Sequence, residues 1–138
     1  MIYHGNRFTF KADVTPEQVE KALESLRNQG RAIPSVKSFV VGRDFGGEYE
    51  WGAVFVIADI DGYWDYLTHP SHLHTDRIGL PLVEKFASVD ITDDSDPEIG
   101  AKIAALHQRR YDEIPDVADL VSDLKEYVGS AAPGQHAD

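Results

Sequence analysis

Hydrophobic and polar positions alternate from Ile2 to Lys11, and a period of two is typical of a β-strand. One face of this predicted strand carries His4, Asn6, Phe8 and Phe10. The spacing then lengthens to that of an amphipathic helix, which we expect to run to about Gly30. Thr15 suits the N-cap, Pro16 the first helical position, and Gln18 can close a capping box.

The next segment predicts a β-hairpin. Residues 36–45 are rich in β-branched and aromatic side chains, residues 50–59 form the returning strand, and a glycine pair between them favours a turn. Both faces of the returning strand are apolar. One face carries Trp51, Ala53, Phe55 and Ile57, and the other carries Gly52, Val54, Val56 and Ala58. Both faces must therefore be covered.

A helical region is predicted over residues 61–86, with a break near His69-Pro70 because proline lacks a backbone donor and restricts the residue before it. Residues 88–92 predict a last strand. The order β-α-β-β-α-β places this unit, residues 1–94, in the α+β class with the ferredoxin-like arrangement. Since that arrangement puts both helices on one face of the sheet, we expect a second copy of the chain to cover the other.

Residues 95–138 are expected to form an acidic, helical C-terminal extension after a turn-like linker. Apolar residues at helical spacing predict two helices that Pro115 separates. The first is marked by Ile99, Ile103 and Leu106, and the second by Val117, Leu120, Val121, Leu124 and Val128. The apolar side of the second helix must be buried, either across a dimer or over a pocket as a lid. Residues 129–138 are expected to fray.

Composition narrows the classes of function. The chain has 138 residues and a net charge of −11, and without a basic stripe it is a poor partner for nucleic acid or for an anionic membrane surface. No apolar run is long enough to span a membrane, and no signal-like start is present, so we expect a cytoplasmic protein. It contains no cysteine, so its chemistry must use oxygen and nitrogen side chains.

Reactive side chains are densest in residues 63–74, where Tyr66 and His72 lie on either side of the predicted helix break. A phenol that donates to an oxyanion and an imidazole that accepts a proton suit enolisation and aldol-type chemistry. His4 shares a strand face with aromatic residues and is a candidate cavity residue. No phosphate-binding glycine loop and no serine nucleophile motif is present, and we expect no cofactor.

Two other interpretations of these residues remain open. The histidines at the break can simply cap or pack a helix end while the aromatic side chains fill the core. A metal could also bind His69, His72 and His74, but no acidic ligand has suitable spacing, so we expect no metal site. In the extension, we expect His107, Arg109 and Arg110 to lie on a solvated face.

Several motifs resemble the stress-responsive dimeric α/β-barrel (Dabb) family over about residues 1–93. They are Met1-Ile2-Tyr3-His4, Ile33-Pro34-x-Val36-Lys37, Gly42-Arg43-Asp44 and above all Asp65-Tyr66-Leu67-Thr68-His69-Pro70-x-His72. The resemblance implies a ferredoxin-like protomer whose sheets pack face to face in a homodimer. Members of the family include stress-associated plant proteins without an assigned reaction and a plant polyketide cyclase that performs a cofactor-free aldol cyclisation.

The resemblance also implies roles for single residues. The catalytic tyrosine and histidine of the cyclase fall on Tyr66 and His72, and a supporting histidine falls on His4. Another cavity histidine of that enzyme falls at Gly52, and a cavity tyrosine falls near Leu26, so the pocket walls differ and a different substrate is expected.

Together these observations predict a small-molecule-binding protein that acts as a cofactor-independent cyclase, lyase or isomerase on a polyketide-like or phenolic carbonyl compound. Tyr66 and His72 would be catalytic. Candidate substrate-binding residues are His4, His69, Trp51, Phe55 and Trp64. The alternatives are a non-catalytic stress-response or ligand-carrier protein and a cofactor-free monooxygenase on the same barrel.

Overall fold

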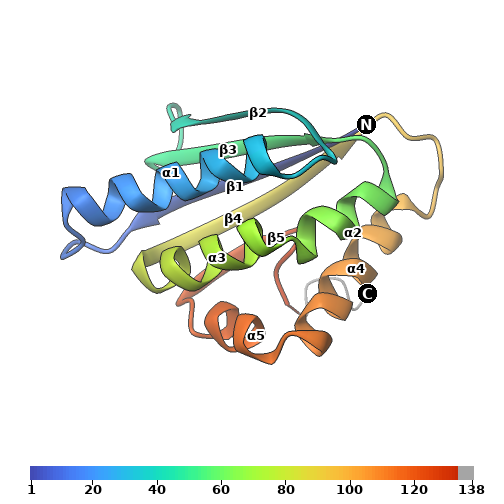
Figure 1. Ribbon diagram of the computed structural model, residues 1–138. Helices are drawn as coiled ribbons and strands as arrows, with labels where there is room; N and C mark the ends of the chain where they lie inside the picture. The colour runs from blue at the N-terminus through green and yellow to red at the C-terminus, as the bar shows by residue number, and fades with distance from the viewer. Residues whose placement is uncertain (134–138) are drawn as a thin grey trace.

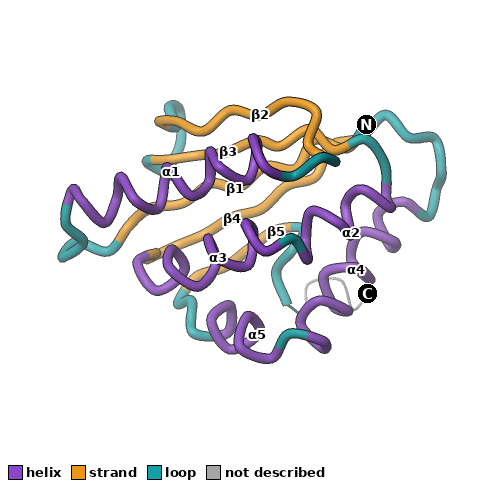
Figure 2. Tube along the Cα trace, viewed as in Figure 1, coloured by secondary structure: helices purple, strands orange, loops and turns teal. Residues whose placement is uncertain are grey.

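The computed structural model describes residues 1–133, in which a five-stranded sheet is covered by helices on one face (Figures 1 and 2). The elements are β1 (Ile2–Phe10), α1 (Pro16–Ala32), β2 (Val36–Arg43), β3 (Trp51–Ile57), α2 (Ile60–Thr68), α3 (Pro70–Gly79), the 3-10 turn η1 (Leu80–Leu82), β4 (Val83–Thr92), α4 (Ile99–Glu113), α5 (Pro115–Ser122) and β5 (Glu126–Gly129). No helix in this part of the chain has the length and apolar character needed to cross a membrane.

The strand order is β2-β3-β1-β4-β5. β1 lies at the centre and pairs antiparallel with β3 and β4, while β2 pairs antiparallel with β3. The predicted order β-α-β-β-α-β is confirmed over residues 1–92. The register places His4 opposite Phe55 on one side and Asp90 on the other.

The two helix starts follow from local sequence. The predicted capping box is present, because Thr15 Oγ1 accepts a hydrogen bond from the Gln18 amide at 3.2 Å and Gln18 Oε1 accepts one from the Thr15 amide at 2.9 Å. At the predicted break, His69 caps α3 by accepting from the Ser71 amide at 3.1 Å, and Pro70 occupies the first turn. The break therefore starts a new helix in a new direction.

Two predicted boundaries are wrong. The helical region does not reach Phe86, because Pro81 interrupts it and β4 begins at Val83, where the chain can pair with the edge of β1. The last predicted helix does not reach Val128. α5 ends at Ser122, and residues 126–129 form a strand parallel to β4, which satisfies backbone groups that β4 would otherwise expose.

β5 ends in a close approach to β4. Gly129 has a φ of 114°, a left-handed conformation that favours glycine, and a Cβ at this position would collide with the Ser88 carbonyl. The next residues are then tied down, because the Ser130 amide donates to Ser88 O at 3.1 Å and the Ala131 amide donates to Ser88 Oγ at 2.8 Å. The predicted fraying of residues 129–138 is thus wrong up to residue 133, and the remainder lies outside the described residues.

The extension shares the hydrophobic core of the first unit. Ile103 of α4 packs in the cluster that contains Tyr63 and Tyr66, and Val117 and Val121 of α5 pack with Leu80. Val117 is fully buried, and burying such a side chain contributes about 1.5–3 kcal/mol to stability. Figure 1 shows α4 and α5 lying against the helix layer, on the same side of the sheet as α2 and α3.

The other face of the sheet has no cover within the described chain. The register puts Tyr3 beside Val56 and Ile91, and Val40 beside Val54, on this open face. Its most exposed apolar side chains are Tyr3, Val40, Val89, Ile91 and Val128, with exposed fractions between 44% and 64%. An apolar patch shared by all five strands marks an interaction surface.

Candidate functional site

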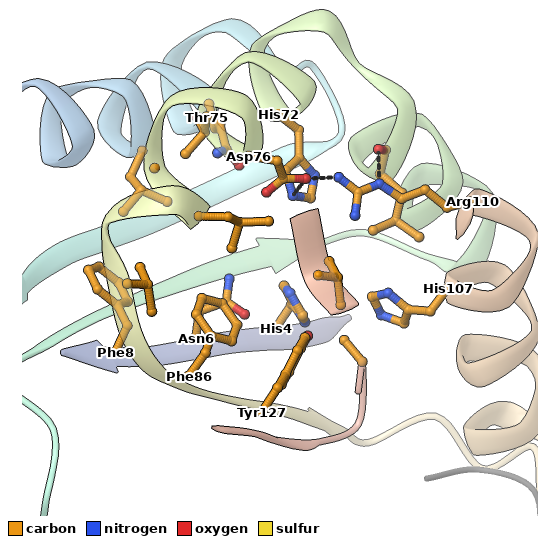
Figure 3. A pocket seen from close by; sticks show the side chains of 18 of the residues that line it. His4, Asn6, Phe8, His72, Thr75, Asp76, Phe86, His107, Arg110 and Tyr127 are labelled. Atoms are coloured by element: carbon orange, nitrogen blue, oxygen red, sulfur yellow. Dashed lines mark hydrogen bonds and ion pairs between the residues drawn. The ribbon is translucent and has the colours of Figure 1, made fainter. Parts of the chain in front are cut away.

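A cavity lies between the sheet and the helices, and both layers supply polar side chains to it (Figure 3). Its volume is about 70 Å³, counted as the space that the centre of a water molecule can occupy. A cavity of this size has room for more than one water molecule and for a small organic group.

Each lining element contributes residues at the spacing of its own periodicity. β1 contributes His4, Asn6 and Phe8, which alternate along the strand. α1 contributes Ala22, Leu26 and Gln29, and α3 contributes His72, Thr75, Asp76 and Gly79, in both cases one helix face. α4 adds His107, Arg110 and Tyr111 from the extension.

Tyr66 lies in the cavity wall and is fully buried. Its hydroxyl makes no hydrogen bond of normal geometry within residues 1–133, and the Asn6 side chain interacts with it only weakly. Burial raises the pKa of Tyr66 well above that of a free phenol, although Arg110 opposes the rise. At neutral pH the hydroxyl therefore keeps its proton and is available as a donor.

His72 lies beside Tyr66, with ring centroids 4.4 Å apart. Its Nδ1 is 3.1 Å from the Tyr66 carbonyl oxygen, and because a carbonyl only accepts, Nδ1 carries a proton and donates it. Burial lowers the pKa of His72 well below its ordinary value, and the charge of Arg110 lowers it further. The ring is thus neutral at pH 7, with a lone pair on Nε2.

A buried ion pair stands next to His72. Arg110 bonds Asp76 through Nη2 and donates from Nε to the Leu67 carbonyl at 2.9 Å. Asp76 Oδ2 also lies 3.6 Å from His72 Nε2 (Figure 3). The expectation of a solvated Arg110 is wrong, since only 4% of the residue is exposed, whereas Arg109 is exposed as predicted.

A second polar network lies behind the cavity, centred on the Tyr63 hydroxyl. That oxygen is 2.9 Å from His4 Nδ1, 2.9 Å from Asp90 Oδ1 and 2.8 Å from His107 Nε2. Asp90 also accepts from His4 Nδ1 at 2.9 Å and from the Ser130 hydroxyl at 2.5 Å. The expectation that His107 is solvated is wrong, because α4 turns it inward and leaves 3% of it exposed.

Asp90 holds this network in a defined charge state. Burial raises the pKa of Asp90, but the charge of His4 and the hydrogen bonds from His4 and Ser130 outweigh burial and bring it to about 2. An ionised Asp90 can only accept, so His4 Nδ1 carries a proton. In neutral His4 the lone pair is then on Nε2.

The same network contains the one metal-like cluster of the described chain, since ligand atoms of His4, Asp90 and His107 lie within 4.8 Å of one another. The Tyr63 hydroxyl already bonds all three, so these groups are satisfied without an ion. The alternative set of His69, His72 and His74 is not brought together. His69 Nδ1 caps α3, His72 lines the cavity and His74 is exposed.

Four predicted substrate-binding residues do not line the cavity. His69 is the cap described above. Phe55 is fully buried in the core between Tyr66 and Phe39, Trp64 lies under the Arg109 guanidinium, and Trp51 packs near Phe8. Of the predicted set, the structure brings together Tyr66, His72 and His4 in the cavity wall.

The sequence pattern did not reveal Gln29, Asp76, His107 or Arg110. Gln29 follows Ala22 and Leu26 at helical spacing, and Asp76 follows His72 by four residues, so both could have been placed on a cavity-facing helix side. The two α4 residues carried no such signal, because polar residues on an acidic amphipathic helix are usually solvated.

Solved structures with this fold include proteins of different activity. A dimeric ferredoxin-like protein of unknown function from Thermobifida fusca YX shares 31% identity, covers 66% of this chain and 89% of its own, and has a TM-score of 0.60. A hydroxynitrile lyase from Passiflora edulis shares 14% identity over 68% of this chain and 94% of its own, with a TM-score of 0.61. A third is SnoaB, a cofactor-independent oxygenase from Streptomyces nogalater. It shares 19% identity over 70% of this chain and 97% of its own, with a TM-score of 0.55.

The last two likenesses show the fold alone. No curated protein matches the sequence at a significant level. The profile of the Stress responsive A/B Barrel Domain matches residues 2–93, which is two thirds of the chain and includes β1 through β4. The chain therefore belongs to the stress-responsive A/B barrel (Dabb) family.

Proposed function

We propose that the cavity binds a small, partly apolar carbonyl or phenolic compound and catalyses cofactor-independent proton transfer on it, as a cyclase, lyase or isomerase does. One observation carries the proposal: Tyr66, whose protonated hydroxyl makes no hydrogen bond of normal geometry within residues 1–133, lies against a neutral His72 in a single cavity. A hydrogen-bond donor beside a base is the combination that enolisation requires.

The reaction would begin with a ketone whose oxygen accepts a hydrogen bond from Tyr66. Nε2 of His72 removes a proton from the carbon next to the carbonyl, and the electron pair of that C–H bond becomes the C=C bond of an enolate. The negative charge collects on oxygen, where the Tyr66 hydroxyl stabilises it. Asp76, 3.6 Å from Nε2, favours the imidazolium that forms.

The enolate has several outcomes. It can take the proton back, attack a second carbonyl to close a ring, or expel a leaving group. The hydroxynitrile lyase and the oxygenase with the same fold show that this architecture hosts enzymes of different activity. His4, held by Asp90, supports the site through its edge-to-face contact with the Tyr66 ring.

We also propose that the protein is a homodimer through the open face of the sheet. Exposed apolar side chains of β1, β2, β4 and β5 lie on this face, and the Thermobifida fusca protein with the same fold is described as dimeric. Pairing two such faces would bury Tyr3, Val40 and Ile91, which are otherwise exposed.

Exchange of α-protons tests the chemical step directly. Acetophenone is incubated with the protein in D₂O, and loss of its methyl signal is followed by ¹H NMR. Tyr66→Phe should slow exchange by about 10²–10³-fold and His72→Gln by about 10²–10⁴-fold. Tyr49→Phe and His74→Gln are matched controls outside the cavity and should exchange at the wild-type rate.

A panel of phenolic, quinone and β-diketone compounds extends the test to binding. A compound that binds in the cavity without exchange or turnover would assign a carrier role instead. If no member of the panel binds, the proposed ligand class is wrong.

A further inference from the structure

The side chain of Gln29 is a buried polar group without an evident structural use. Gln29 is 1% exposed, it lines the cavity, and its Oε1 has no hydrogen-bond partner within the described residues. Its backbone carbonyl accepts from the Ile33 amide at 3.1 Å, so the unpaired acceptor is the side-chain oxygen Oε1. Unpaired buried amides cost stability and are rare in folded proteins.

Contacts between α1 and α3 place Gln29 near the level of His72, since Ser25 Oγ lies 2.6 Å from Thr75 Oγ1 and Asn28 reaches Ser71. Leu26 and Ile33, which flank it on α1, pack in the hydrophobic cluster that contains Tyr66. The neighbouring Asn28 side chain donates to Ser71 at 3.4 Å, one residue before His72. Tyr66 and Gln29 therefore line one cavity, and within residues 1–133 each has a buried polar atom without a hydrogen bond of normal geometry.

Their chemistry is complementary rather than equivalent. The Tyr66 hydroxyl is a donor and selects an acceptor such as a carbonyl oxygen, while Gln29 Oε1 is an acceptor and selects a donor such as a hydroxyl. The cavity offers no unpaired charge, because Arg110 is bound to Asp76. The aromatic side chains of Phe8, Phe86 and Tyr127 also line the cavity (Figure 3).

We propose that Gln29 is a specificity-determining residue and that the ligand is a neutral hydroxyaryl ketone, with its carbonyl on Tyr66 and its hydroxyl on Gln29. This inference rests on the proposed function, because it assigns a ligand to the same cavity. It adds a requirement that Tyr66 and His72 do not impose: a second oxygen that carries a proton.

The test compares acetophenone with its 2′-, 3′- and 4′-hydroxy isomers by isothermal titration calorimetry. In the wild type, at least one isomer should bind about tenfold tighter than acetophenone, because its hydroxyl pairs a buried acceptor. Gln29→Leu should remove that gain, so that the isomer and acetophenone bind the variant with about equal affinity. Gln29→Met, which matches glutamine in length, provides a second variant should Leu disturb packing.

Stability gives an independent readout. Because the substitution removes an unpaired buried amide, ligand-free Gln29→Leu should melt at or above the wild-type temperature. Gln108→Leu, the same change at an exposed position on α4, should alter neither melting nor discrimination between the ketones.

The outcomes separate the two proposals. If an isomer gains affinity in the wild type and keeps the gain in both Gln29 variants, the Gln29 assignment is wrong while the cavity assignment stands. If acetophenone binds but none of the isomers binds more tightly, the hydroxyl requirement is wrong. If no ketone binds, both proposals fail. A marked drop in melting temperature in both variants would show a structural role and overturn the inference.

Discussion

The Tyr63 hydroxyl on α2 lies 2.8 Å from His107 Nε2 on α4, so a residue of the family domain and a residue of the extension complete one buried network. The same hydroxyl reaches Asp90 on β4, and Asp90 reaches Ser130 beyond β5. Residues 94–133 are therefore held by specific polar contacts as well as by apolar packing. Both kinds of contact lie behind the cavity wall that carries His4.

Tyr63→Phe should lower the free energy of unfolding by about 1–3 kcal/mol, because Asp90 and His107 each lose a buried hydrogen bond. Urea denaturation monitored by circular dichroism measures the change. Tyr49→Phe, which removes a hydroxyl outside this network, should shift the midpoint far less. Equal effects of the two variants would contradict a special role for the Tyr63 hydroxyl.

Asp90 should make stability depend on pH at the acid end. Its folded pKa of about 2 lies below the ordinary value of 3.8, so ionised Asp90 stabilises the fold above about pH 4, and this contribution is lost as the pH falls toward 2. Asp90→Asn should therefore cost on the order of 2 kcal/mol at pH 7, and its difference from the wild type should shrink between pH 4 and pH 2. Denaturant titrations across that range measure the difference. Asp93→Asn, at an exposed carboxylate, is the control, and a pH-independent gap would refute the assignment.

The imidazole of His72 should not titrate near pH 6.5, since burial and Arg110 lower its pKa well below that value. Because the unfolded chain takes up the proton first, the depressed pKa makes this residue destabilising as the pH falls below 6.5. Proton exchange on a bound ketone should stay constant from pH 8 to pH 6.5. Histidine signals in NMR spectra, assigned with His72→Gln, would reveal a normal titration if the prediction is wrong.

Ile91→Glu should break the proposed dimer, because it places a charge among the apolar side chains of the open face, where 64% of the Ile91 surface is exposed in the single chain. Analytical ultracentrifugation should show the dissociation constant rising by about a hundredfold or more. Ala101→Glu adds the same charge on the exposed side of α4 and should leave the association state unchanged. A wild-type protein that sediments as a monomer would rule out the dimer.

Local signals in the sequence were sufficient for the order of the elements in residues 1–92, although the helical region predicted to reach Phe86 ends before β4. Alternation at Ile2–Phe10, the capping box at Thr15 and the proline at position 70 each act within a few residues, and each is confirmed. The extension was harder to predict. Residues 126–129 carry a spacing that suits a helix, and only the open edge of β4, which is distant in sequence, selects a strand.

In the candidate site too, local sequence predicts some residues, whereas others depend on contacts that are distant in sequence. His4, Tyr66 and His72 could be grouped from strand alternation and from the motif around the helix break. Trp51, Phe55 and Trp64 are aromatic residues on adjacent elements, but which of them reach the cavity depends on tertiary packing. His107 and Arg110 are buried only because α4 lies over the cavity, and partners on α2 and α3 compensate their polar groups.

The glycine at position 129 can be used to recognise the same C-terminal arrangement in relatives of which only the sequence is known. A chain without β5 has no position equivalent to Gly129. A chain whose last strand runs along β4 must place a residue without a Cβ next to the Ser88 carbonyl. Relatives that share the same buried network should therefore pair a glycine at the end of their last short strand with a histidine on the preceding long helix. The presence of both residues would distinguish family members with this C-terminal extension from members without it.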